Sequence, residues 1–396
     1  MLGWEGRLEA VRDDRRQGRI PTAVVVRSAV VMVLARLGSL NALEQTRPSR
    51  FWRGWLGGPM PSADTVGRVC GRIEVAGVRA VLRQEYGRLK RMKALPPATH
   101  GLMVAVVDGH ESHATFRRCC PGCLERRVHT ARGERVQYYH RYVALRLVGG
   151  TLELMLDLEE QGRGEGEVGA ATRLLERVLK DYPRAFDVIT ADGLYAQGPF
   201  FNFVLSHGQH VVAVLKDEQR DLLQDARALF ETMPSAKPRE GSVQGQAWDA
   251  EGFRTWPQVH SPVRVVRSLE RRTVRRQLDG QAEEQVADWF WVTTLPTRQA
   301  PTPVVIQVGH RRWNIENEGF NDLVNHWHAD HVYKHHPTAM LVLWLLAMAG
   351  VNLFLAFYRR NLKPAARALA SMLHVARRIS AVLYADLPDP TPRGPP

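Results

Sequence analysis

The sequence predicts an α/β protein with a mixed sheet, preceded by a helical region and interrupted by a β-rich insertion. Two apolar stretches, residues 102–107 and 186–191, each run directly into an Asp-Gly pair. Such continuous apolar runs are typical of strands buried on both faces. Strands and amphipathic helices alternate between and after them, which is the order of an α/β fold. A chain of 396 residues is long enough for two or three domains.

Composition narrows the class further. Hydrophobic residues make up 44% and charged residues 24% of the chain, which excludes a disordered protein. Four cysteines are too few for a disulfide framework. The first residues, MLGWEGRLEAVRDD, lack the apolar segment of a secretory signal. We therefore expect a reducing, cytoplasmic location.

The first 95 residues carry most of the positive charge. They hold 18 Lys or Arg against 8 Asp or Glu, a net charge of +10, whereas the remainder holds 36 against 33. Arginine-rich coding bias would act along the whole chain, so this concentration favours a basic N-terminal module. Apolar spacing predicts helices at 23–37, after Ser62 as an N-cap, and around 78–89. Short helices with outward arginines suit helix-turn-helix-like DNA binding, and a helical cap on the next domain fits equally well.

The elements after the Leu95-Pro96-Pro97 linker follow from apolar patterning and turn residues. Expected strands lie at residues 102–107, 136–148, 152–158, 186–191, 210–215, 263–266, 271–276 and 286–295, and expected helices at 168–179, 199–205, 221–230 and 306–327. Residues 339–358 are long and apolar enough for a transmembrane helix, but Gly350 and Asn352 favour a helix buried in the core. Residues 388–396 should be disordered.

Three acids stand at positions where a metal site forms. Asp108 and Asp192 follow predicted strands, and ligands gather at the C-terminal ends of such strands. Two carboxylates meeting there repel each other unless a divalent cation holds both. Glu316 lies on a later helix, four residues after Arg312 and thus on the same face.

The chain resembles the DDE transposases of bacterial insertion sequences. The resemblance rests on Val107-Asp108-Gly109, on Ala191-Asp192-Gly193-Leu194-Tyr195 and on Arg312-Trp313-Asn314-Ile315-Glu316, and covers about residues 100–330. It is strongest to the group with a β-rich insertion and a Tyr–Arg–Glu–Lys signature. Val214-Leu215-Lys216 and Val292-Thr293-Thr294-Leu295 are also similar to that group.

The resemblance implies a ribonuclease-H-like catalytic domain. Asp108, Asp192 and Glu316 would then bind two Mg²⁺ ions for DNA strand cleavage and transfer, with Arg312 holding a phosphate or orienting Glu316. The expected partners are double-stranded DNA, as element inverted repeats and as target, and a second copy of the chain in a homodimer, without a membrane. Binding to DNA would associate the protein with the nucleoid. A non-catalytic DNA-binding derivative of a transposase is the alternative.

The resemblance also implies a division of the chain. The expected parts are a helical DNA-binding domain (1–95), the first part of the catalytic core (96–220), the β-rich insertion (221–300), the second part of the core with the catalytic helix (301–384) and a disordered tail (385–396).

Two positions depart from the signature of that group. Counted from Glu316, the signature Tyr falls at Gly309 and the Lys at Leu323. In the family, these residues are associated with phosphate contacts near the cut, so the departure concerns the DNA contacts and not the metal site. Glu318 competes with Glu316 for the third position, but it lacks an Arg four residues before it.

A cysteine cluster suggests a second metal. Cys120 and Cys123 have the C-x₂-C spacing of a structural zinc site, and Cys119 adjoins them. The candidate partners are His110, His113, His129 and His140. The alternative is a β-turn with incidental thiols. A later histidine run, His326, His328, His331, His335 and His336, favours a solvated helix end that faces DNA, with metal binding as the alternative.

Overall fold

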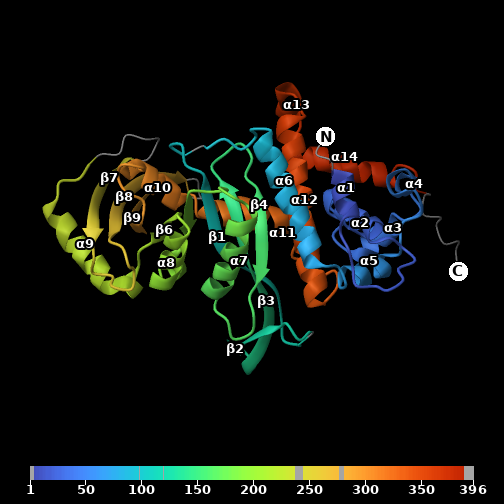
Figure 1. Cartoon of the computed structure of the whole chain (residues 1–396), viewed down its shortest axis with the longest axis horizontal. Coiled ribbons are helices and arrows are strands. Elements are labelled where there is room, and N and C mark those ends of the chain that lie inside the picture. Colours follow the sequence, from blue (N-terminus) through green and yellow to red (C-terminus); the bar gives the residue numbers. More distant parts are fainter. Residues whose placement is uncertain (1–3, 98, 119, 237–243, 276–280, 388–396) are drawn as a thin grey trace.

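The computed structural model of the protein describes residues 4–97, 99–118, 120–236, 244–275 and 281–387. The molecule is elongated (Figure 1), with N-terminal helices at one end, a sheet in the middle and the strands of the insertion at the other end. This arrangement confirms the predicted α/β class with a mixed sheet.

Short helices form the N-terminal region as predicted. They are α1 (Trp4–Glu9), α2 (Thr22–Leu34), α3 (Leu40–Gln45), α4 (Phe51–Leu56), α5 (Ala63–Cys70) and α6 (Val75–Arg91). Ser62 is the N-cap of α5, and its hydroxyl accepts a hydrogen bond from the Thr65 N–H at 3.3 Å. The predicted apolar positions of α5 and α6, among them Val66 and Val78, are buried.

A nine-stranded mixed sheet forms the centre of the chain. Its strands are β1 (Val104–Thr115), β2 (Leu124–Thr130), β3 (Gly133–Val148), β4 (Met155–Glu160), β5 (Val188–Ala191), β6 (His210–Val214), β7 (Gln244–Phe253), β8 (Val263–Arg275) and β9 (Ala282–Thr293). Their order is β2-β3-β1-β5-β6-β9-β8-β7, with β4 paired to β3. β1, β5 and β6 are parallel to one another, and the remaining pairs are antiparallel.

Helices cover both faces of this sheet, which explains why β1 begins as a continuous apolar run. Ala105 and Val107 belong to the core formed with α7 (Glu167–Asp181), α8 (Gly198–Ser206) and α9 (Arg220–Thr232). Val104 and Val106 point to the opposite face. That face is covered by α10 (Thr302–His310), the π-helical turn η3 (Ile315–Phe320), α11 (Asn321–Trp327) and α12 (Pro337–Arg360).

One prediction about the strands is wrong. β1 does not end before Asp108 but continues to Thr115, because its second half still pairs with β3. The strands of the predicted β-rich insertion join the same sheet. β9 pairs with β6, so β7, β8 and β9 extend the central sheet at its edge.

Helix α12 lies in the core, as the sequence predicted for residues 339–358. It is long and apolar enough to cross a membrane, yet 72% of its most apolar window is buried inside the protein. It packs against α2, α5 and α6 on one side and against β4 on the other. Its one buried amide, Asn352, accepts a hydrogen bond from the Met155 N–H at 3.1 Å and donates one to the Met155 carbonyl at 2.8 Å.

Helix α6 fastens the N-terminal helices to the part of the chain that contains β4 and α7. Arg79 pairs with Asp157 and Glu159 at 3.1 Å each, and Arg83 pairs with Asp181 at 3.2 Å. Lys90 donates to two carbonyls in the loop after α7, at 2.8 and 2.9 Å. Part of the positive charge of the first 95 residues is therefore paired with acids and carbonyls of the same chain. This agrees with the alternative of a helical cap on the next domain.

The C-terminal residues return to the N-terminal helices. After α13 (Pro364–Leu369), helix α14 (Met372–Tyr384) packs against α2. The Asp386 carboxylate accepts hydrogen bonds from the Ser49 hydroxyl and the Arg50 N–H, at 2.7 Å each. The expected disordered tail therefore does not begin at residue 385, and residues 388–396 lie outside the described residues.

Replacing Asn352 by Ala should destabilise the protein. The substitution leaves the buried N–H and carbonyl of Met155 without their partners, at a cost of roughly 2–4 kcal/mol. Urea unfolding followed by circular dichroism measures this loss. Asn41→Ala, at an exposed position of α3, serves as the control and should change the stability by less than about 0.5 kcal/mol. Equal stability of the two variants would contradict the role assigned to Asn352.

Candidate active site

Strand register brings the first two acids to one level of the sheet. β1 and β5 run parallel with Val104 opposite Val188 and Val106 opposite Thr190. Continuing the same offset places Asp108 beside Asp192, just where the pairing of the two strands ends. The Asp192 carboxylate accepts a hydrogen bond from the Leu194 N–H at 2.8 Å and so caps the turn that follows.

Asp108 lies among other carboxylates. The pKa of Asp108 is raised to about 8. Burial is the largest cause, and the negative charges of Glu316, Glu167 and Asp192 contribute to the rise, whereas the hydrogen bond from the Gly109 N–H lowers the pKa. The first two acids and the predicted third acid therefore act on each other electrostatically. Such surroundings disfavour the negative charge of the carboxylate, and a nearby cation stabilises that charge.

The third acid lies on a π-helical turn. Asp108 and His110 alternate with Gly109 along β1, so they point to the face covered by η3. The His110 ring stacks on Phe320 of this turn, with the ring centres 4.7 Å apart. Helical periodicity predicted an unbroken helix from 306 to 327, but α10 ends at His310 and η3 begins at Ile315. π-helical turns inside helices are frequent at functional sites.

The structure separates Glu316 from its competitor Glu318. Buried Arg146 of β3 donates a hydrogen bond to the Asn314 carbonyl at 2.7 Å and lies 3.8 Å from the Glu318 carboxylate. Glu318 thus belongs to a group with Arg146 and Glu153. Glu316 is exposed, and its charge is one of those that act on Asp108. Arg146 also anchors the π-helical turn to the sheet.

Arg312 contacts a neighbouring aromatic ring. Among the described residues no ion pair joins it to Glu316. Its guanidinium carbon lies 4.1 Å from the centre of the Trp313 ring, in a cation–π arrangement. Trp313 in turn packs edge-on against Trp289 of β9.

Packing explains the two departures from the signature of the resembled group. A side chain at Gly309 would meet the indole of Trp291, because a Cβ there would lie 2.6 Å from a ring carbon. The buried Trp291 therefore leaves no room for a tyrosine at this position. Leu323, at the position of the signature lysine, is 1% exposed and packs in the core with Phe320 and Trp327.

Sequence reasoning missed the role of Glu167. Glu167 is the first residue of helix α7, and its carboxylate also reaches the site. It accepts a hydrogen bond from the buried Tyr195 hydroxyl at 2.9 Å and lies 3.3 Å from the Arg141 guanidinium. A Cβ on Gly109 would lie only 2.3 Å from this carboxylate, so a side chain there would displace Glu167 from its contacts with Tyr195 and Arg141. The Asp-Gly pair and the tyrosine after Asp192 were the available signals.

Lys216 is a second residue whose place at the site was not predicted from the sequence. It follows β6, the parallel neighbour of β5, and its side chain lies over Gly193, where an added Cβ would be 2.7 Å from its Cδ. The side chain is exposed at the same end of the sheet as Asp192.

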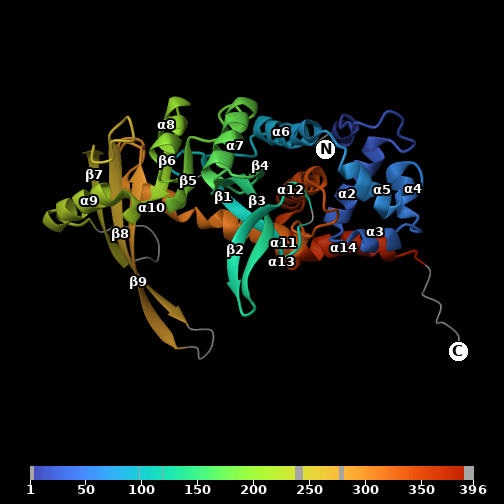
Figure 2. The same ribbon diagram turned by 90° about the horizontal axis from the view of Figure 1, so that it is seen from below.

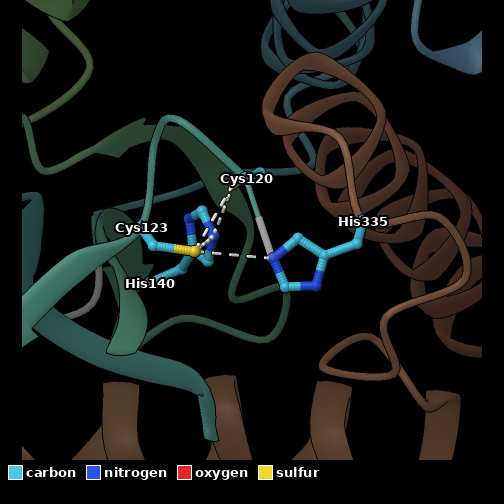
Figure 3. A group of neighbouring side chains, drawn as sticks. All are labelled: Cys120, Cys123, His140 and His335. Carbon is cyan, nitrogen blue, oxygen red and sulfur yellow. Dashed lines mark hydrogen bonds between the residues drawn. The ribbon is translucent and has the colours of Figure 1, made fainter. Parts of the chain in front are cut away.

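The cysteine cluster forms a separate group (Figure 3). Cys120, Cys123, His140 and His335 offer ligand atoms that all lie within 4.8 Å of one another. Within the described part of the chain this is the one group of His, Cys, Asp and Glu so closely gathered, and the three acids are spread more widely. Of the predicted partners, His140 belongs to the group and His110, His113 and His129 do not. His335 was missed as a partner, and Cys119 lies outside the described residues.

Comparison with protein families matches residues 101–353 to the family described as "Transposase DDE domain". Comparison with curated proteins finds no match. The matched range contains Asp108, Asp192 and Glu316 and also the Cys/His group. Members of this family are polynucleotidyl-transferase-type enzymes that act on DNA with divalent metal ions. The chain belongs to the transposase DDE domain family and is a transposase.

Proposed function

We propose that this transposase binds the inverted ends of its element, cuts the DNA strands there and joins them to target DNA. The observation that carries the proposal is the meeting of Asp108, Asp192 and Glu316, from β1, the end of β5 and η3, at one end of the parallel strands. Ligands and catalytic residues of open α/β sheets gather at this end.

Asp108, Asp192 and Glu316 fit a site for two Mg²⁺ ions. Their oxygen ligands suit a hard cation, and their mutual repulsion, which raises the pKa of Asp108, is relieved when positive charge lies between them. When bound, the metal ions would supply charge stabilisation at the scissile phosphate and a lowered pKa for the attacking hydroxyl.

The side chains of the chain itself have distinct tasks in this proposal. The hydrogen bonds from the Gly109 and Leu194 N–H groups hold Asp108 and Asp192 in place. The exposed Glu316 can adjust when DNA arrives. Arg312 lies on Trp313, four residues before Glu316, and Lys216 lies over Gly193, which follows Asp192; we assign these two cations to the phosphates beside the cut.

The surface that grips the element ends lies on the N-terminal helices. Arg50, Arg53 and Arg68 are exposed on α4 and α5, away from the ion pairs that fasten α6. Since two ends must be cut and joined together, the active form is a homodimer. We expect the protein in the cytoplasm and on the nucleoid when it is bound to DNA.

Removing any of the three acids should abolish cleavage. Asp108→Asn, Asp192→Asn and Glu316→Gln each keep the shape of the side chain but lose the charge that holds the cation. A gel assay with Mg²⁺ and a labelled DNA duplex carrying one element end should show no cut strand, while binding of the duplex stays close to that of the unchanged protein.

Glu318→Gln is the matched control for the triad, because it removes a neighbouring carboxylate that pairs with Arg146 instead. It should cleave at close to the normal rate. Cleavage by Glu316→Gln together with its loss in Glu318→Gln would move the third ligand to Glu318. Binding without cleavage by the unchanged protein would favour the alternative, a non-catalytic DNA-binding derivative.

Gly109→Ala should reduce cleavage about 100-fold, because the new methyl group displaces the Glu167 carboxylate and shifts Asp108 beside it. Gly166→Ala, one residue before α7, has open space around the new methyl group and should leave cleavage unchanged. Combining Gly109→Ala with the shorter Glu167→Asp should restore part of the rate. Normal cleavage by Gly109→Ala would show that this contact does not position Asp108.

Arg53→Ala and Arg68→Ala should weaken binding of the element end. Each phosphate contact that is lost lowers the slope of log affinity against log salt by about 1. Binding measured by fluorescence anisotropy over a range of salt concentrations gives this slope. Arg220→Ala, exposed at the start of α9 and outside the N-terminal helices, is the control. An unchanged slope in both N-terminal variants would place the DNA grip elsewhere.

A further inference from the structure

Cys120, Cys123, His140 and His335 come from three distant parts of the chain. The two cysteines lie in the turn between β1 and β2, His140 lies on β3, and His335 precedes α12. Figure 3 shows the His335 ring directed from the α12 side toward the cysteines. Cys120, Cys123 and His140 are buried, and His335 is partly buried.

The distances between these side chains match the edges of a zinc tetrahedron. Zinc bonds sulfur at about 2.3 Å and imidazole nitrogen at about 2.0–2.1 Å, which places two sulfurs about 3.8 Å apart and a sulfur and a nitrogen about 3.5 Å apart. The two Sγ atoms are 3.6 Å apart, well beyond the about 2.05 Å of a disulfide bond. The Nε2 atom of His140 lies 3.3 and 3.6 Å from the two sulfurs, and that of His335 lies 3.7 Å from Cys123 Sγ.

The surroundings of His140 prepare it as a ligand. Its Nδ1 lies 3.0 Å from the Glu160 carboxylate, so this nitrogen carries the proton and donates it. Nε2 then presents a lone pair toward both sulfurs, which is the tautomer that binds a metal. A carboxylate behind a ligating histidine is the usual support for a zinc site.

We infer that Cys120, Cys123, His140 and His335 bind one structural zinc ion that fastens the base of the β2–β3 hairpin to the start of α12. All four positions of the tetrahedron are protein ligands, as in structural zinc sites. The closed set leaves no place for substrate, so the ion has no part in strand cleavage.

The zinc site connects the two chain segments that leave the active site. β1 leads from Asp108 toward the turn that holds the two cysteines. The chain leads from Glu316 in η3 through α11 to His335. Gly122 of the turn lies beside Pro337, the first residue of α12: an added Cβ would lie 3.1 Å from the proline ring. A metal bond across this contact holds β1 and η3 in a fixed relation.

The same ion holds the β2–β3 hairpin, which projects from the body on the same side as the β8–β9 hairpin (Figure 2). Arg127, Arg132 and Arg135 are exposed on this hairpin. Four zinc ligands at its base therefore set the direction in which these positive charges extend.

Elemental analysis of the full-length protein purified without chelator tests the inference. We expect about one zinc ion per chain in the unchanged protein and in Asp108→Asn. Cys120→Ser, Cys123→Ser and His335→Gln should each fall below a tenth of an ion. Cys70→Ala, which removes a buried thiol of α5, and His331→Gln, in the same histidine run as His335, are the matched controls and should keep one ion.

A second measurement covers the case in which ligand variants fail to fold. Unchanged protein stripped with chelator and titrated with Co²⁺ should develop the visible bands of a tetrahedral ion and the near-ultraviolet band of thiolate ligation, at one equivalent. Glu160→Gln, which leaves all four ligands, should weaken zinc binding about 10- to 100-fold. Folded protein with less than a tenth of a zinc ion and no cobalt spectrum, or a Cys120–Cys123 disulfide found by mass, would overturn the inference.

The outcome is independent of the proposed function. Zinc content and the cobalt spectrum are read without DNA, so a zinc site in a protein that cleaves nothing leaves this inference intact. Cleavage by protein that never binds zinc would remove the zinc site and leave the assignment of the three acids.

Discussion

The parallel pairing of β1 with β5 is the constraint on which the rest of the site depends. It fixes Asp108 and Asp192 at one level, and a shift of the register by one residue would turn one carboxylate to the opposite face. Burial of a sheet face specifies the register, and here α7–α9 and α10–α12 bury both faces. This packing holds the two acids close together despite their mutual repulsion.

Around this pairing, buried polar contacts place the third acid. Arg146 joins β3 to the π-helical turn through the Asn314 carbonyl, and His110 stacks on Phe320 beside it. The proposed zinc site would add a third link between the same two regions. Glu316 itself remains exposed, so these contacts hold the backbone that carries the acid and leave its side chain at the surface.

Much of the fold was predictable because it depends on local patterns. The strand at 186–191, the helix at 168–179 and the cap at Ser62 follow from apolar spacing and turn residues, and the structure confirms them. The continuation of β1 beyond Asp108 was not predictable, because it depends on pairing with β3, a long-range contact. The same holds for Glu167 and His335. Glu167 looks like an ordinary first residue of a helix, and His335 like one more histidine in a run, until the fold brings Gly109 and the cysteines to them.

Helix α12 gives the molecule a property that is not evident from its sequence. The N-terminal helices and the central sheet both pack against this one helix, and the ion pairs of Arg79 and Arg83 also join the two parts directly. The two parts therefore share one core and do not move as separate bodies on a linker. If the N-terminal helices bind the element end, the fixed distance between these helices and the active site sets the number of base pairs between the recognised sequence and the cut. Such an element tolerates a changed base in this interval better than an inserted or deleted one.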